Sequence, residues 1–267
     1  MKKIVMVMII VALIVAGCGT TPAPESTDNT DKDNAYEAPA ESSSATDSNV
    51  VFTITDAAAD MGTVTEIKVT VDSIKVHSDA KGWVTVSDES KTFDLLELKA
   101  EQKQALLAEA NLETGTYNQL RLDISKVVVV DDKGETEAKL PSGELKIQGE
   151  LEVKDGTTST ASFDFIADES LHVTGNGKYI MAPVIQLETR NNAEVSVKSD
   201  NSVVIKDGEV KTNIKVGMDI SGNVNANAKI PVDVELNVGS SGKIFLGKKL
   251  SVKTNSAVDT MVDAVIE

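Results

Sequence analysis

The sequence predicts an all-β protein, an antiparallel β-sandwich with one or two short helices. Three observations support this fold class. Apolar and polar residues alternate over many short segments, turn signals separate these segments, and strong helix formers gather in few places. At 267 residues and 41% hydrophobic composition, the chain is long enough to bury a sizeable core, which excludes disorder over its full length.

The N-terminus has the pattern of a secretory signal peptide over residues 1–17. Lys2 and Lys3 precede an unbroken apolar run over residues 4–16, which is shorter than the roughly 20 residues of a membrane-spanning helix. The run ends at Gly17 and at Cys18, the only cysteine. Residues 13–18 (LIVAGC) resemble the prokaryotic lipobox, in which the cysteine is lipidated and becomes the new N-terminus.

This resemblance implies a lipid attachment at Cys18 and a protein tethered to a membrane on its extracytoplasmic side. The location would be the cell surface, or the outer membrane in a two-membrane bacterium, because a residue other than Asp, Gly19, follows the cysteine. Two acyl chains would make the attachment stable. The alternative is a chance cysteine at the end of an ordinary signal peptide.

Residues 18–49 combine the lipidated cysteine with an acidic linker rich in Ser, Thr, Pro and Ala. Such a composition offers too little apolar surface to offset the entropy of ordering, so we expect a disordered spacer. Deleting residues 22–48 should accordingly leave the stability of the folded part unchanged.

Residues 50–190 read as the sandwich itself. Over residues 65–77 the apolar positions alternate but change phase at Asp72-Ser73, which predicts a strand with a bulge or a bend. Further strands are expected at 120–124, 145–153, 163–165 and 195–197. Turn signals lie between them, at 132–134 (DKG), 141–143 (PSG), 155–156 (DG) and 175–177 (GNG).

Two helices are expected. Residues 99–110 (KAEQKQALLAEA) are strong helix formers, followed by Asn111 and Gly115 as stop signals. A second, short helix is expected near the C-terminus, where residues 258, 261, 262 and 265 are apolar at helical spacing; a final strand is the alternative there.

Residues 191–267 form either a β-rich C-terminal extension or a small second domain. Further alternating segments lie at 203–205, 210–216, 230–238 and 250–252. The charge changes near Arg190-Asn191-Asn192, since residues 50–190 hold 14 basic and 25 acidic side chains whereas residues 191–267 hold 9 and 10. A domain boundary, or at least a change in the role of the surface, is therefore expected at this point.

The composition excludes several function classes. A formal net charge of −16 repels nucleic-acid backbones, so no nucleic acid is expected as a partner. Two histidines and one cysteine leave no Cys/His zinc site, disulfide framework or Cys–His catalytic pair. Nucleotide-binding loops and nucleophile elbows are not found.

The histidines and some acidic residues are considered as metal ligands. His77 and His172 are interpreted as strand-end or surface residues, because no further nitrogen or sulfur ligand accompanies them. Asp56 and Asp60 offer oxygens that suit Ca²⁺, but the same side chains also cap turns. We assign neither residue as a metal ligand.

Three other carboxylates, Asp94, Glu97 and Asp164, are of the type that glycosidases pair across a scissile bond. Any acidic β protein offers such pairs, so none is assigned as catalytic. Aromatic residues make up only 3% of the chain. If the core uses all of them except Tyr36, little remains to stack on a sugar ring, which weakens a carbohydrate-binding interpretation centred on Trp83.

Gly115-Thr116-Tyr117, followed by alternating apolar residues, resembles the turn into a strand of transthyretin-like or immunoglobulin-like sandwiches. The glycine allows a tight turn, and an aromatic ring closes the end of the sandwich. Tyr117 and Tyr179 are therefore interpreted as core or corner residues.

Eight short motifs in residues 50–190 together resemble a family of prokaryotic surface lipoproteins, domain of unknown function 4382. They are Thr55-Asp56-Ala57, Gly82-Trp83, 93–98 (FDLLEL), 115–122 (GTYNQLRL), 140–143 (LPSG), 163–165 (FDF), 177–179 (GKY) and 183–185 (PVI). The resemblance implies a secreted all-β domain, usually lipid-anchored, and carries no established activity or site. Ala58 departs from the proline that often follows the Asp-Ala pair in the family.

Taken together, the sequence favours a non-catalytic structural or binding module that is anchored through Cys18 and requires no cofactor. Its partners would be the membrane and an envelope or extracellular protein or glycan. Two alternatives stay open: a secreted hydrolase that uses carboxylates or calcium, and a calcium-stiffened, adhesin-like element.

Overall fold

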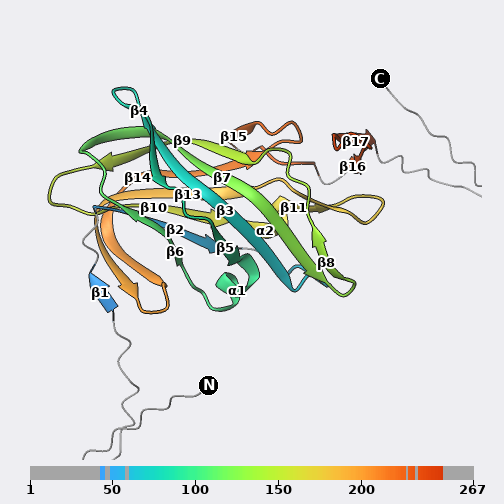
Figure 1. Ribbon diagram of the computed structural model, residues 1–267, viewed down its shortest axis with the longest axis horizontal. Helices are drawn as coiled ribbons and strands as arrows, with labels where there is room; N and C mark the ends of the chain where they lie inside the picture. Colours follow the sequence, from blue (N-terminus) through green and yellow to red (C-terminus); the bar gives the residue numbers. More distant parts are fainter. Residues whose placement is uncertain (1–42, 46–48, 58–59, 227, 232–233, 249–267) are drawn as a thin grey trace, which may run out of the picture. The chain divides into compact units, whose positions relative to one another are not determined.

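The computed structural model describes residues 43–45, 49–57, 60–226, 228–231 and 234–248. Most of these residues lie in two β-sheets (Figure 1). The seven-stranded sheet consists of β1 (Ser43–Ala45), β2 (Val50–Asp56), β6 (Ala105–Ala110), β10 (Ser159–Phe165), β13 (Val184–Lys198), β14 (Val203–Met218) and β15 (Val224–Ala226). The six-stranded sheet consists of β3 (Glu66–Ser78), β4 (Gly82–Ser87), β5 (Lys91–Asp94), β7 (Gly115–Asp131), β8 (Gly134–Glu137) and β9 (Glu144–Val153).

The remaining elements are small. Two further strand pairs are present, as are two short helices. These elements are β11 (Leu171–Val173) with β12 (Tyr179–Met181), β16 (Val234–Val238) with β17 (Ile244–Lys248), α1 (Leu95–Ala100) and α2 (Ala167–Ser170). No helix in the described part of the chain has the length and apolar character needed to span a bilayer.

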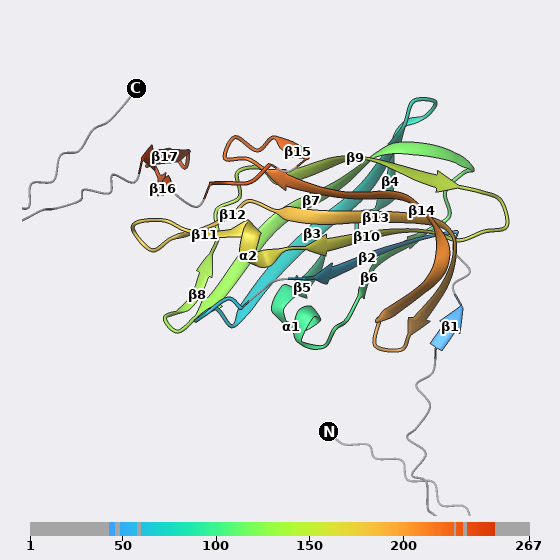
Figure 2. The same ribbon diagram turned by 180° about the vertical axis from the view of Figure 1, so that it is seen from behind.

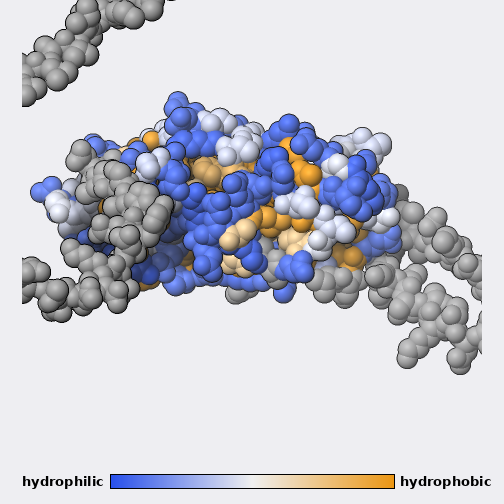
Figure 3. Space-filling model, turned by 90° about the horizontal axis from the view of Figure 1, so that it is seen from below, coloured by the Kyte–Doolittle hydropathy of each residue, from blue (hydrophilic) through white to orange (hydrophobic). Residues whose placement is uncertain are grey.

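The two sheets face each other across a common core (Figures 1 and 2). Phe52 and Phe163 from the seven-stranded sheet, and Ile67, Leu120 and Leu122 from the six-stranded sheet, are fully buried in one hydrophobic cluster. Burying each such side chain stabilises the fold by roughly 1.5–3 kcal/mol. Seen from below, the surface is largely hydrophilic, with hydrophobic residues visible among the polar ones (Figure 3). The all-β sandwich expected from the sequence is confirmed.

Strand β3 follows the alternation in its sequence. Ile67 and Val69 point into the core, and beyond the phase change Ile74 and Val76 do so as well. The pairing of β3 with β7 shifts register between Thr70 and Val71 and again between Val71 and Ser73, where Asp72 is skipped at the expected bulge. Because Asp72 is an extra residue in β3, the apolar side chains on both sides of it point into the same core.

One strand pair corrects the expectation of a purely antiparallel sandwich. Strands β2 and β10 run parallel, from Val50 opposite Ser159 to Asp56 opposite Phe165. A parallel pair needs a long crossover connection, and here the six-stranded sheet lies within that connection. Sequence alternation is identical for parallel and antiparallel strands that bury one face, so it did not distinguish them.

The prediction of a helix over residues 99–110 is wrong for most of that range. Helix α1 ends at Ala100, and residues 105–110 form strand β6, which pairs with β2. Asp94 caps the helix by accepting the N–H of Leu96 at 3.0 Å. Leu107 is buried in the core from the strand. Burial and pairing at the sheet edge override a helix propensity of a few tenths of a kcal/mol per residue.

The sheet is continuous across Arg190, where a boundary was expected from charge. Strand β13 runs through this position, and β14 pairs with it from Gly217 opposite Val184 to Val203 opposite Val197. A register shift after Thr189 and a left-handed backbone at Asn192 (φ 50°) bend the strand here without ending it. Residues 203–218 therefore extend the seven-stranded sheet as a single strand.

The expectation of a disordered spacer up to residue 49 also needs a correction. Residues 43–45 form strand β1, which pairs with residues 196–198 of β13, so residues 43–45 are not part of a disordered linker. The other expectations for the chain ends, namely Cys18, the signal peptide, the strand at 250–252 and the C-terminal helix, lie outside the described residues. Of the strand expected over 230–238, residues 234–238 are observed as β16.

Candidate functional site

The outer half of the β13–β14 hairpin bends over one face of the seven-stranded sheet. At its tip, Leu106 donates its N–H to the carbonyl of Asn201 at 2.8 Å, and Val203 donates to the carbonyl of Gln104 at 2.7 Å. The hairpin thus contacts the segment around β6, although β6 lies three places from β13 and four from β14 in the order of the sheet. Figure 2 shows this bend, in orange and brown, where the two strands leave the line of their neighbours. We call residues 193–207 the arch.

A small apolar cluster lies beneath the arch. Val51 of β2 is buried against Val195 and Val203, and Leu106 and Ile205 pack around them. Because Val51 is on the opposite side of β2 from the core residue Phe52, this strand is buried on both faces. The cluster explains how the arch stays in place on the sheet.

Beside this cluster, between Ile205 of the arch and the sheet, lies an open polar cleft of about 320 Å³. Its walls come from outward-facing positions of β2, β10, β13 and β14, since the alternate residues of these strands fill the core. The residues that line the polar cleft are Thr55, Gln104, Ser162, Asp164, Gln186, Glu188, Arg190, Ile205 and Asn213.

Two residues that line the polar cleft, Gln104 and Ser162, form a hydrogen-bonded group with the buried Thr53. Gln104 donates through Nε2 to Thr53 Oγ1 at 2.7 Å and to Ser162 Oγ at 2.8 Å, and Thr53 donates to Ser162 at 3.0 Å. Ser162 Oγ therefore accepts two hydrogen bonds, which use both its lone pairs. These bonds do not use its own proton, which Ser162 can donate to a further acceptor.

On the neighbouring strand β13, Glu188 lies opposite Ser162 and forms an ion pair with Arg190, with a nitrogen–oxygen distance of 2.6 Å. Asn213 donates to the second oxygen of Glu188 at 3.3 Å, and Arg190 Nη1 donates to the carbonyl of Asp207 at 2.9 Å. Gln186 donates to Asn213. Both charged groups of this ion pair are thus held by neighbours.

Asp164 differs from the other charged residues of the polar cleft. The strand register places it between Thr55 of β2 and Gln186 of β13. Its Oδ1 atom is buried, and no donor in the described part of the chain bonds to it. Burial raises the pKa of Asp164 above its ordinary value, because a charge there loses hydration without gaining a partner.

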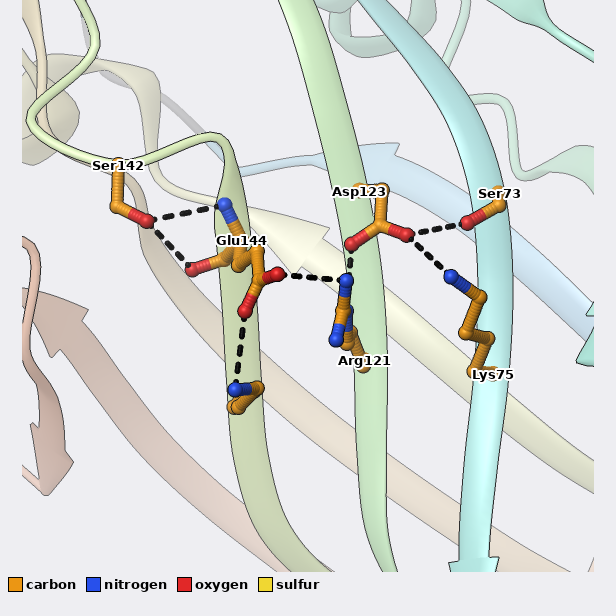
Figure 4. A network of polar contacts seen from close by, with 7 residues as sticks. Ser73, Lys75, Arg121, Asp123, Ser142 and Glu144 are labelled. Carbon is orange, nitrogen blue, oxygen red and sulfur yellow. Dashed lines mark hydrogen bonds and ion pairs between the residues drawn. The ribbon is translucent and has the colours of Figure 1, made fainter. Parts of the chain in front are cut away.

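The outer face of the six-stranded sheet carries a polar network in which, unlike Asp164, the central aspartate has several donors (Figure 4). Asp123 accepts hydrogen bonds from Ser73 at 2.5 Å, Arg121 at 2.6 Å and Lys75 at 2.9 Å. Arg121 also reaches Glu144 at 2.7 Å. Burial opposes the charge on Asp123, but the hydrogen bonds from these donors outweigh it and lower the pKa of Asp123 to about 2.

Trp83 lies near the same network and is 40% exposed. Its ring is 5.2 Å from the ring of His77, and the guanidinium of Arg121 lies 6.0 Å from its centroid. Phe245 is exposed as well. The assumption that every aromatic residue except Tyr36 serves the core is therefore wrong for these two side chains.

The structure separates the histidines and gives them different surroundings. His77 contacts Asn118 through Nδ1 at 3.1 Å at the end of β3. His172 lies in β11, where its Nε2 is buried without a hydrogen-bond partner among the described residues, and burial lowers its pKa. Within that part of the chain no group of three or more His, Cys, Asp or Glu side chains is arranged to hold a metal ion.

The two aspartates considered for calcium act on the backbone. Asp56 accepts the N–H of Ala167 at 3.1 Å at the start of α2, and Asp60 accepts the N–H of Gly62 at 2.9 Å within a turn. These are the capping contacts that the sequence offered as the alternative interpretation.

The three carboxylates considered for hydrolysis do not come together. Asp94 and Glu97 lie at the N-terminal end of α1, whereas Asp164 lies in the polar cleft. Sequence reasoning missed the residues that line the cleft together with Asp164, among them Gln104, Gln186, Glu188, Arg190 and Asn213. The alternation of polar residues at 186, 188 and 190 was the available signal, because it marks one outward face of β13.

Both tyrosines interpreted as core or corner residues are buried, which confirms that prediction. Tyr117 donates its hydroxyl to the carbonyl of Glu113, four residues upstream, at 3.1 Å. Tyr179 donates to Asp131 at 2.7 Å. Burial and this bond to Asp131 raise the pKa of Tyr179 to about 12.

Comparison with known proteins gives one match. Residues 47–183 match the family described as Domain of unknown function (DUF4382). No curated protein and no solved structure matches the chain. The matched region covers about half of the chain and contains β2 to β12, including the Ser162 and Asp164 side of the polar cleft. The chain belongs to the DUF4382 family.

Proposed function

We propose that this protein is a non-catalytic binding module, tethered through a lipid on Cys18 to the extracytoplasmic side of a membrane. The observation that carries the binding role is the polar cleft, whose lining includes Asp164, with a buried oxygen that no described donor satisfies, and Ser162, whose own proton is not used by the bonds it accepts. Polar groups left without partners inside a cleft are costly unless a ligand or ordered water satisfies them.

The tether rests on the lipobox-like residues 13–18 and on the acidic segment that follows. With β1 taking part in the sheet, the spacer comprises residues 19–42, and a random-coil estimate of ~5–6 Å × √n gives it a reach of roughly 25 Å. The module would present its cleft near the membrane, to an envelope or extracellular protein or glycan.

The tether is tested by fractionation of cells that express the wild type or Cys18→Ala. We expect the wild type in the membrane fraction, labelled by radioactive fatty acid, and the variant unlabelled and released from the membrane. Membrane association and labelling that are unchanged in Cys18→Ala would contradict the anchor.

One observation favours a second candidate, a hydrolase acting on glycans. Glu188 is a diagonal neighbour of Asp164 on the adjacent strand, which places the two side chains roughly 7–8 Å apart. Inverting glycosidases use a protonated and an ionised carboxyl group at about this separation. Burial raises the pKa of Asp164, as such an acid requires, but the ion pair with Arg190 occupies Glu188.

The two candidates differ in turnover. We would incubate envelope glycans with the wild type, Asp164→Asn and Glu188→Gln, and measure the release of reducing ends. The binding module predicts no release above buffer for any of the three proteins. Release by the wild type that both substitutions abolish would instead establish the hydrolase.

A further inference from the structure

Asp164 is the one ionisable side chain lining the polar cleft that the described residues leave without a partner. Glu188 and Arg190 neutralise each other, and Arg190 is held further by the carbonyl of Asp207. The lining as a whole thus keeps one net negative charge, in a chain whose net charge is already −16. Such a site attracts cations.

The surroundings of Asp164 are suited to a ligand that also carries hydroxyl groups. Ser162 is two residues away on the same face of β10, which separates the two side chains by roughly 6.5–7 Å along the strand. Ser162 has a proton to donate, and Asp164 has an oxygen to accept. Around them the cleft offers amide and hydroxyl groups from Gln104, Gln186 and Thr55.

The polar cleft has room for a small molecule. At about 30 Å³ per water, its volume of about 320 Å³ corresponds to roughly ten waters. This is enough for one sugar ring or a short amino alcohol. Ile205 provides one apolar wall, against which the carbon face of such a ligand can pack.

We propose that the polar cleft binds a small hydroxylated amine, such as an amino sugar, whose ammonium group pairs with Asp164 and whose hydroxyl oxygen accepts the proton of Ser162. This inference rests on the binding role proposed above and names its ligand class. A neutral sugar could satisfy the same hydrogen bonds, but only a cation also compensates a carboxylate that has lost hydration.

The test measures binding of matched probes to the full-length protein in detergent, by calorimetry. The amines are glucosamine, galactosamine and ethanolamine, and their neutral counterparts are glucose, galactose and ethylene glycol. We expect at least one amine to bind 10-fold or more tightly than its counterpart. Asp164→Asn should remove that preference, and Ser162→Ala should weaken binding of amine and neutral sugar alike.

Asp123→Asn is the matched control, because it makes the same chemical change on the outer face of the other sheet. It should leave the preference for amines intact. The melting temperature of each variant confirms that it is folded. The inference is overturned if no amine binds more tightly than its neutral counterpart, or if Asp164→Asn keeps the preference. Equal binding of amines and neutral sugars that Ser162→Ala weakens would reject the ligand class but retain the binding module.

Discussion

Asp123 and Asp164 are both aspartates on the outward faces of central strands, yet their surroundings move their pKa values in opposite directions. Asp123 has three donors within hydrogen-bond distance, two of them cationic. Asp164 lies between Thr55 and Gln186, and none of the described donors bonds to its buried oxygen. The first arrangement stabilises the charged form, and the second destabilises it. Asp123 is therefore expected to stabilise the fold, whereas the proposed binding role belongs to Asp164.

Asp123→Asn should lower the free energy of unfolding at pH 7 by about 1 kcal/mol, a value discounted because the network is partly exposed to solvent. The folded-state pKa of about 2 lies below the unfolded value, so this stabilisation is present above about pH 4 and is lost as the pH falls toward 2. Urea denaturation of wild type and variant at several pH values measures it. A difference that stays constant from pH 6 to pH 2.5 would contradict the assignment.

Asp164→Asn should behave in the opposite way. Since burial raises the folded-state pKa of Asp164, its charge destabilises the fold once the pH exceeds the unfolded value. We expect the variant to be as stable as the wild type below about pH 4 and more stable at pH 7, by up to roughly 1 kcal/mol. The same urea series measures this difference, and a loss of stability at pH 7 would show that Asp164 has a structural partner.

At the scale of elements, the arch depends on the bend at Asn192 and Gly208. Gly208 has φ +81°, and a Cβ added there would lie 2.8 Å from the carbonyl oxygen of Asn191 and 3.1 Å from Ala193. Both strain and contact oppose a side chain, so Gly208→Ala should cost about 2–3 kcal/mol. Faster hydrogen exchange at the amides of Leu106 and Val203 would show that the arch has loosened.

Gly62→Ala is the control for that substitution. Gly62 has φ +63°, but nothing lies within 4 Å of the added Cβ, so only the conformational cost of about 1 kcal/mol applies. Equal losses of stability in the two variants, with unchanged exchange at Leu106, would mean that the contact at Gly208 does not hold the arch.

Strand β1 gives the linker a structural role at its end. Deleting residues 22–42 should leave the melting temperature unchanged, whereas deleting residues 22–48 also removes the pairing with residues 196–198 of β13. The loss should be about 1–2 kcal/mol, since a three-residue pairing contributes a few hydrogen bonds at most. Thermal unfolding compares the two deletions, and identical melting temperatures would show that β1 contributes no stability.

The elements that sequence reasoning predicted well are those whose pattern is local. The bulge in β3 and the turns at Gly134, Gly156 and Gly177, all with positive φ, follow from neighbouring residues. Strand β6 was mistaken for a helix because its residues favour a helix in isolation, while its pairing with β2 involves residues more than 50 positions away. Propensity decides only where tertiary contacts do not.

At the scale of the whole molecule, the seven-stranded sheet joins distant parts of the chain. Strand β10 lies between β2 and β13, and the core includes Ile185, Leu187, Val216 and Met218, all beyond the family match at residue 183. A fragment of residues 47–183 should therefore fail to fold cooperatively, whereas residues 43–248 should unfold as the full-length protein does. Circular dichroism during heating measures both, and cooperative melting of the shorter fragment would show that the family region is an independent domain.

By itself, the sequence determined the all-β class, the turns, the burial of Tyr117 and Tyr179, and membership of the DUF4382 family. These properties depend on residues close together in the chain, whose alternation and conformational preferences can be read directly. Only the tertiary structure decided the parallel pairing of β2 with β10, the arch and the polar cleft. The cleft brings Thr55, Ser162 and Asn213 together through strand register, and register is set by the packing of the whole core rather than by any one segment.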